Sequence, residues 1–219
     1  MAKLFDLPRW IAVEGPIRAG KSSLAHILAE RMGARRISEP ENNPFLERFY
    51  RGEHDAAFPA QMWFLHERHQ QMIREKAAKR DVPLVSDYIF EKDKLFAYIN
   101  LSDAELDLYN RYYNLFRNDV PAPDLVIYLQ ATPEVLKQRL KRKDIPNERA
   151  ISESYLEQTI RAYEHFFFHY TASDLLVVNT SDIDFVHNNS DLQMLMRRLA
   201  EPVKGTQYFL PLGAEAREA

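Results

Sequence analysis

The stretch Gly15-Pro16-Ile17-Arg18-Ala19-Gly20-Lys21-Ser22 matches the phosphate-binding pattern Gly-x-x-x-x-Gly-Lys-Ser/Thr at every fixed position. An apolar run at residues 10–14 precedes it and predicts a strand, and residues 23–30 follow it with the apolar spacing of a helix. The N–H groups of such a loop and the N-terminus of its helix attract phosphate groups. We therefore predict a triphosphate site. A plain glycine turn before a helix is the alternative, and both flanks disfavour it.

Two side chains of this loop are predicted to act on the triphosphate. Lys21 would reach the β- and γ-phosphates, and the Ser22 hydroxyl would bind Mg²⁺.

The composition of the chain narrows its class. With 219 residues the chain is long enough for one sizeable α/β domain, and its net charge of −3 does not favour binding to a nucleic acid polymer. It has no cysteine, which excludes disulfides, thiolate metal sites and thiol nucleophiles. Neither a membrane-spanning stretch nor the apolar region of a signal peptide is recognisable. We therefore expect a cytoplasmic enzyme that binds no membrane.

Strand-like and helical stretches alternate along the chain, which predicts a parallel sheet covered by helices. We expect strands at residues 10–14, 35–39, 82–87, 124–130 and 174–179. We expect helices near residues 23–30, 55–80, 88–99, 102–118, 133–143, 152–170 and 188–200. The predicted fold is α/β, with a P-loop NTPase-type parallel sheet of about five strands, flanking helices and a helical lid at about residues 139–150.

Ligands of such sheets collect at the carboxyl ends of the strands, where two acidic residues are expected. Glu39 precedes Pro40, which favours extended backbone there, and its carboxylate could take a proton from a hydroxyl that attacks the γ-phosphate. A solvated loop glutamate is the alternative. Asp87 ends the next strand and is predicted to hold Mg²⁺ or its water, to cap a helix that begins at Tyr88, or to do both.

Basic residues end the predicted helix at 133–143. Arg139 and Lys143, or Arg139 and Arg142, share one helical face and could clamp the transferring phosphoryl group. A solvated basic helix end is the alternative.

Aromatic and polar residues alternate around residues 58–68. Gln61 and Arg68 lie two turns apart on one helix face, and the glutamine amide suits the edge of a nucleobase. Phe96 could stack on that base, whereas Trp63 and Phe64 are expected to belong to the core.

Several longer stretches make the chain resemble the deoxynucleoside kinase family, in its bacterial deoxyadenosine/deoxyguanosine/deoxycytidine kinase branch. The resemblance runs from Ile11 to about Asp191. The stretches that carry it are Val13-Glu14-Gly15-Pro16-Ile17, Ser38-Glu39-Pro40, residues 41–50, residues 86–97, residues 123–129 and Tyr155-Leu156-Glu157.

This resemblance implies transfer of the ATP γ-phosphate to the 5′-hydroxyl of a deoxynucleoside by a homodimer joined through helices. It also implies a single P-loop kinase domain at residues 1–201 with a tail at 202–219. Within that tail, residues 205–211 are expected to dock on the domain and the residues after Gly213 to be disordered.

Residue roles follow from the same resemblance. The catalytic residues would be Glu39 as general base, Lys21, Arg68, Arg139 and Lys143. ATP would contact Gly15, Ile17, Arg18, Ala19, Gly20, Lys21, Ser22, Ser23, Arg139 and Asp182. The deoxynucleoside would contact Glu39, Tyr50, Gln61, Arg68, Asp87, Lys92, Phe96 and Glu148, where Tyr50 and Glu148 hold the 3′-hydroxyl. Mg²⁺ would be bound by Ser22 and Asp87.

The chain departs from the family pattern at three places. Arg18 stands where a small residue is common, and the arginine of an acid-Arg-Ser motif is missing after Asp87, where Lys92 would replace its charge. Asp144 and Ile145 stand where the lid often has glycine and arginine.

Two other functions are weighed against this one. A nucleoside monophosphate kinase of the thymidylate kinase type would need extra arginines in the acceptor pocket. A non-catalytic accessory subunit would be expected to lose residues such as Lys21, Ser22, Glu39 and Glu148, and all four are present.

Overall fold

Six parallel strands form the central sheet of the structure, a computed structural model that describes residues 8–53, 55–75, 77, 79, 81–143 and 151–211. The strands are β1 (Trp10–Glu14), β2 (Arg35–Ile37), β3 (Leu84–Ser86), β4 (Leu125–Gln130), β5 (Asp174–Asn179) and β6 (Thr206–Phe209). They lie side by side in the order β2-β3-β1-β4-β5-β6. The predicted α/β fold with its parallel sheet is confirmed, and all five predicted strands are present.

The sixth strand comes from the tail of the chain. Thr206–Phe209 pairs with β5, so the expected docking of residues 205–211 is confirmed, and the count of about five strands is one short. This strand has only four residues and alternates between exposed and half-buried side chains, which gives a weak signal in the sequence. The residues after Gly213 lie outside the described part of the chain.

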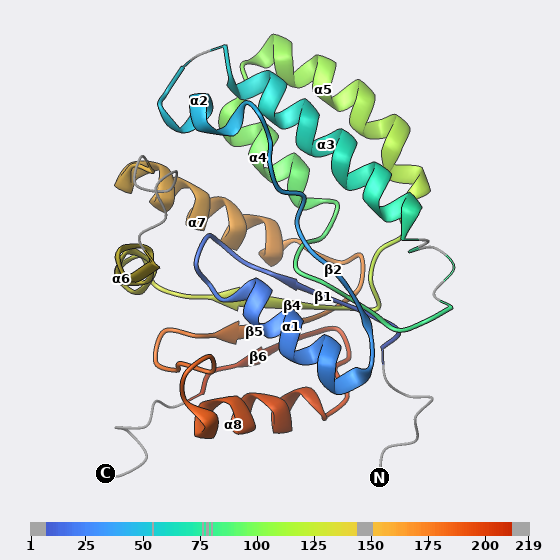
Figure 1. The fold of residues 1–219 in the computed structure, drawn as a ribbon, viewed down its shortest axis with the longest axis vertical. Helices are drawn as coiled ribbons and strands as arrows, with labels where there is room; N and C mark the ends of the chain where they lie inside the picture. Colours follow the sequence, from blue (N-terminus) through green and yellow to red (C-terminus); the bar gives the residue numbers. More distant parts are fainter. Residues whose placement is uncertain are drawn as a thin grey trace.

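Helices cover both faces of the sheet (Figure 1). They are α1 (Lys21–Met32), α2 (Leu46–Tyr50), α3 (Ala57–Arg74), α4 (Lys92–Asn100), α5 (Asp103–Phe116), α6 (Pro133–Lys143), α7 (Glu153–Phe168) and α8 (Asn189–Leu199), with a 3₁₀ turn η1 (Arg117–Asp119). In Figure 1, α1 and α8 lie on one side of the sheet, and α7 and α4 lie on the other, with α3 and α5 beyond. No helix in the described residues is both long and apolar enough to span a bilayer.

The alternation of β1 sends its side chains into these two layers in turn. Ile11 and Val13 belong to the core cluster that includes α1 residues, whereas Ala12 belongs to the cluster that includes α7 residues. Because successive side chains of a strand point to opposite faces, Glu14 follows Ala12 toward the α4 and α7 side. The strand thus carries a carboxylate into the helical layer beside the phosphate loop.

The predicted helix at 88–99 begins later than expected. Residues 88–91 form a turn, and α4 begins at Lys92 with Glu91 as its N-cap, so the expectation that Asp87 caps a helix from Tyr88 is wrong. The backbone N–H of Asp87 donates to the Ile37 carbonyl (3.1 Å) and that of Ile89 to the Glu14 carboxylate (3.0 Å). These bonds hold the segment as a connection between strand ends.

Candidate active site

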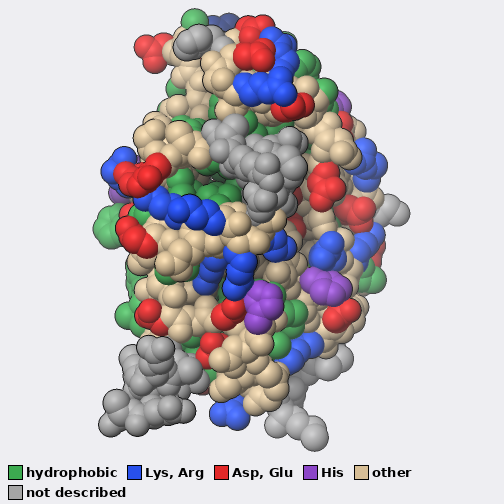
Figure 2. Space-filling model, turned by 60° about the vertical axis from the view of Figure 1, so that its left-hand side comes forward, with side chains coloured by type: hydrophobic (Ala, Val, Ile, Leu, Met, Phe, Trp, Pro, Cys, Tyr) green, Lys and Arg blue, Asp and Glu red, His purple; other side chains and the backbone are tan. Residues whose placement is uncertain are grey.

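A cavity of about 660 Å³ opens at the carboxyl ends of the strands, between the phosphate loop and helices α2, α3, α4 and α7. Figure 2 shows a hollow on this face, with hydrophobic side chains inside it and Lys and Arg side chains beside it. The predicted site residues that line the cavity are Ile17, Lys21, Ser22, Glu39, Tyr50, Gln61, Arg68, Asp87, Lys92 and Phe96. Residues from four helices and three strand ends therefore meet in one place.

The glycines of the phosphate loop are required by close contacts. Gly20 has a φ of 105° and is the N-cap of α1, and a Cβ there would lie 2.6 Å from the Phe185 ring. At Gly15 a Cβ would lie 2.5 Å from the Leu129 carbonyl oxygen. Since glycine has no side chain to cap the first turn of α1, the N–H groups of this turn can receive a phosphate. The loop therefore fits a triphosphate.

Lys21 lies against this loop. Its Nζ donates to the carbonyls of Gly15 (2.8 Å) and Pro16 (3.0 Å). Burial, followed by the positive charge of Lys92, lowers the pKa of Lys21 to about 8. A phosphate group bound next to this ammonium would therefore stabilise the protonated, charged form of Lys21.

Arg18 adopts backbone angles that favour glycine. Its φ is 65°, in the left-handed region that few non-glycine residues enter. Arg18 therefore places a cation in the loop at a residue with a strained backbone.

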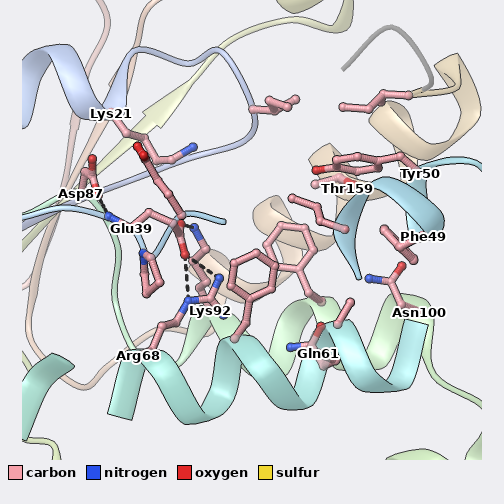
Figure 3. Close-up of a pocket in the computed structure, with 18 of the residues that line it drawn as sticks. Lys21, Glu39, Phe49, Tyr50, Gln61, Arg68, Asp87, Lys92, Asn100 and Thr159 are labelled. Carbon is pink, nitrogen blue, oxygen red and sulfur yellow. Dashed lines mark hydrogen bonds and ion pairs between the residues drawn. The ribbon is translucent and has the colours of Figure 1, made fainter. Parts of the chain in front are cut away.

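Glu39 stands at the centre of an ion-pair network (Figure 3). Arg68 donates to its Oε1 through Nε (2.8 Å) and Nη2 (2.5 Å), and the Lys92 ammonium contacts its Oε2. The Glu39 backbone N–H donates to the Asp87 carboxylate at 2.6 Å. Burial alone would raise the pKa of Glu39, but the charges of Arg68 and Lys92 outweigh it and lower the pKa to about 2. Glu39 is therefore an ionised acceptor that faces the cavity.

Gln61 is fixed by a second carboxylate. Its Nε2 donates to the backbone carbonyl of Asp93 (2.9 Å) and to the Asp93 carboxylate (2.5 Å), while Tyr109 donates to the same carboxylate at 2.7 Å. Asp93 is fully buried and is also ion-paired with Arg68. Because both amide hydrogens of Gln61 are used in this way, the side chain presents its carbonyl oxygen to the cavity.

Aromatic side chains form the walls beside Gln61. Phe96 on α4 and Phe64 on α3 both line the cavity, so the expectation that Phe64 belongs to the core is wrong. Tyr50 lines the far end of the cavity near Asn100 and Thr159, as Figure 3 shows. Such walls suit a flat ring placed between Phe96 and the Gln61 carbonyl.

Several predicted residues lie elsewhere. The Arg139 guanidinium donates to the Thr180 carbonyl (2.7 Å) and the Ile183 carbonyl (3.3 Å), so it binds the loop after β5 rather than the cavity. Lys143 is an exposed residue at the end of α6, and Asp182 is exposed in that same loop. Glu148 and the rest of the expected lid beyond Lys143 lie outside the described residues.

Oxygen donors for Mg²⁺ are present but few. The described residues contain no group of three or more His, Cys, Asp or Glu side chains placed to hold a metal ion. Ser22 and Asp87 line the cavity beside Lys21. Mg²⁺ is commonly bound by one or two protein oxygens together with water and substrate phosphates, so these residues fit a cation that arrives with a triphosphate.

Sequence reasoning assigned no role to Glu14, which is fully buried and contacts both the loop and α4. The sequence does contain a signal for it. Glu14 is a charged residue at the end of an otherwise apolar strand, directly before the phosphate loop. Asp93 was also missed as the residue that orients Gln61.

Comparison with known proteins agrees with this geometry. Residues 11–204 match the family model described as deoxynucleoside kinase. The chain is 35% identical over 199 residues to a deoxyguanosine kinase of Bacillus subtilis (88% of this chain, 96% of the relative). It is 28% identical over 208 residues to a deoxyadenosine/deoxycytidine kinase of the same organism (90% and 94%). A solved structure of deoxyadenosine kinase from M. mycoides with bound dATP superposes with a TM-score of 0.75 at 26% identity, covering 88% of this chain and 99% of that one.

Proposed function

Because the chain belongs to the deoxynucleoside kinase family, we propose that it transfers the γ-phosphate of ATP to the 5′-hydroxyl of a deoxynucleoside. One observation carries this proposal: Glu39 and the phosphate-loop residue Lys21 line the same cavity as Gln61 and Phe96. A nucleoside seated with its base on these two residues would direct its 5′-end toward Glu39 and the loop.

The donor phosphates would be held by the glycine loop and Lys21. The N–H groups at the start of α1 and the Lys21 ammonium both favour negative charge there. When bound, Mg²⁺ neutralises charge on the β- and γ-phosphates, and Ser22 and Asp87 would hold it. Arg139 would contribute indirectly. It binds the loop after β5, which the resemblance places beside the adenine of ATP.

Glu39 would orient the attacking hydroxyl. The transition state of phosphoryl transfer is commonly loose, so positioning matters more than early proton removal. A carboxylate with a pKa of about 2 is a weak base but a dependable hydrogen-bond acceptor, and it can take the proton late in the transfer. Arg68 and Lys92 hold it in place.

The acceptor base would be selected by whether it can donate a hydrogen bond to Gln61. The Gln61 carbonyl accepts, so it would pair with a base that offers an N–H donor, such as the amino group of adenine or cytosine. Phe96 would stack on that base, and Tyr50 together with Glu148 would hold the 3′-hydroxyl, as the family resemblance implies.

A monophosphate acceptor is the second candidate, and the charges of the cavity disfavour it. Arg68 already pairs with Glu39 and Asp93, and Lys92 already pairs with Glu39, so these cations would not be available to an acceptor phosphate. A deoxynucleoside and its monophosphate, supplied together with ATP and Mg²⁺, test this choice. We expect the nucleoside to be consumed first, whereas phosphorylation of the monophosphate alone would reject the proposal.

The assembly and location form part of the same proposal. We propose a homodimer joined through α4 and α7, because these packed helices carry the exposed aromatic residues Tyr98 (59% exposed) and Phe168 (78% exposed). Its place would be the cytoplasm, where ATP is supplied.

A further inference from the structure

Glu14 is a buried carboxylate between the phosphate loop and the base-binding helices. It is 0% exposed and ends β1. Its Oε1 accepts from the Gly15 N–H (2.9 Å) and from the Tyr163 hydroxyl (2.9 Å), and its Oε2 accepts from the Ile89 N–H (3.0 Å). A fully satisfied buried carboxylate of this kind has a fixed position.

Lys92 connects Glu14 to the catalytic carboxylate. The Lys92 Nζ lies 3.8 Å from the Glu14 carboxylate and contacts that of Glu39 directly. Its side chain is 5% exposed, and its charge also reaches Lys21 in the loop. One ammonium is therefore shared by two carboxylates at the junction of loop and acceptor cavity.

We propose that Glu14 is a positioning residue for phosphoryl transfer, which holds the Lys92 ammonium between Glu39 and the phosphate loop. This inference rests on the proposed function. Among the described residues, Lys92 is paired with the carboxylates of Glu14 and Glu39. Without the Glu14 charge, Glu39 would be its one carboxylate partner there. Lys92 would then lose the attraction that offsets its contact with Glu39, so its ammonium would be held more tightly on an oxygen that the 5′-hydroxyl needs and drawn away from the Glu14 side of the site.

A double-mutant cycle tests this link between the two residues. Glu14→Gln keeps the size of the side chain and removes its charge. We expect kcat to fall by about tenfold, while the KM values for ATP and deoxynucleoside stay within about threefold. If Glu14 acts through Lys92, Glu14→Gln causes no further fall in the Lys92→Met background. Equal falls in both backgrounds would overturn the proposal.

Two further variants separate charge from packing. Tyr163→Phe removes one hydrogen bond from Glu14 and leaves its charge, so we expect a smaller fall in kcat. A fall as large as that of Glu14→Gln would overturn the proposal. Tyr128→Phe is the control, because Tyr128 is equally buried, stacks on Tyr163 and does not line the cavity. It should keep the parental kcat. If Glu14→Gln does not fold, Glu14→Asp takes its place in the cycle, because the shorter side chain moves the carboxylate away from Lys92.

The unfolding midpoint makes the test independent of the substrate. If the parental chain phosphorylates no deoxynucleoside, the proposed function fails. The link between Glu14 and Lys92 is then judged by thermal unfolding of the same four proteins. A double variant that loses less than the sum of the two single losses supports the link, and additive losses reject it.

Discussion

At the residue scale, the proposed chemistry depends on the charged groups that surround the Glu39 carboxylate. Glu39 meets Arg68 and Lys92, and these two cations keep it ionised at neutral pH. Asp93 in turn contacts both Arg68 and Gln61, so the residues proposed to place the hydroxyl and to bind the base are held by the same carboxylate. In the proposed reaction, recognition of the acceptor base would thus be coupled to placement of the Glu39 carboxylate.

The first prediction concerns Glu39 itself. Replacement Glu39→Gln keeps the shape of the side chain but removes the charge that, in the proposed mechanism, accepts the hydroxyl proton. We expect kcat to fall by a factor on the order of 10²–10⁴ while ATP binding is largely retained. Steady-state kinetics and calorimetric ATP titration measure the two effects, with Glu41→Gln as the matched control on the same segment. Turnover close to the parental value would remove Glu39 as the base.

The second prediction follows from the lowered pKa of Lys21. A triphosphate binds the charged ammonium, and this charge is lost as the pH rises through a pKa of about 8. Affinity for a non-hydrolysable ATP analogue should therefore weaken on the alkaline side of about pH 8, well before an ordinary lysine would titrate. Titrations at a series of pH values measure this effect. An affinity that stays constant up to about pH 10 would contradict it.

At the element scale, short connections at the strand ends place the site, and not all of them could be read from the sequence. The buried run of β4 and the helix after the phosphate loop were predicted because their patterns are local. The turn at residues 88–91 was not, because the bond that shapes it joins Ile89 to Glu14, 75 positions earlier. Arg139 was expected at the phosphates, but its partners in the loop after β5 are 41 and 44 positions away.

The third prediction tests the phosphate loop. Gly20→Ala places a methyl group against the Phe185 ring at a residue with left-handed φ. We expect a loss of about 1–3 kcal/mol in the free energy of unfolding and a marked loss of ATP binding. Gly52→Ala is the control, since Gly52 also has a positive φ (80°) but no atom would lie within 4 Å of its Cβ. Equal losses in the two variants would show that the Phe185 contact is unimportant.

At the scale of the whole molecule, the cavity proposed to bind the acceptor lies between the sheet and a helical layer built from α2, α3, α4 and α7. Two of these helices, α4 and α7, also carry exposed aromatic side chains. An interface there would support the wall of the cavity from outside, so assembly and catalysis would share the same helices.

The fourth prediction concerns this interface. Sedimentation should show a dimer, and the double variant Tyr98→Lys with Phe168→Lys should raise its dissociation constant by about tenfold or more. Leu115→Lys is the matched control, because Leu115 is similarly exposed (68%) but lies on α5. Dissociation by the Leu115 variant alone would place the interface on α5 instead.

The most direct test of the central claim is identification of the product. The chain is incubated with ATP and Mg²⁺ against the four deoxynucleosides, their monophosphates and the matching ribonucleosides, and the products are identified by mass and by phosphorus NMR. Our account predicts a 5′-monophosphate from one or more deoxynucleosides whose base carries an amino group, and no product from the monophosphates. Products formed only from monophosphates, or none at all while ATP still binds, would contradict it.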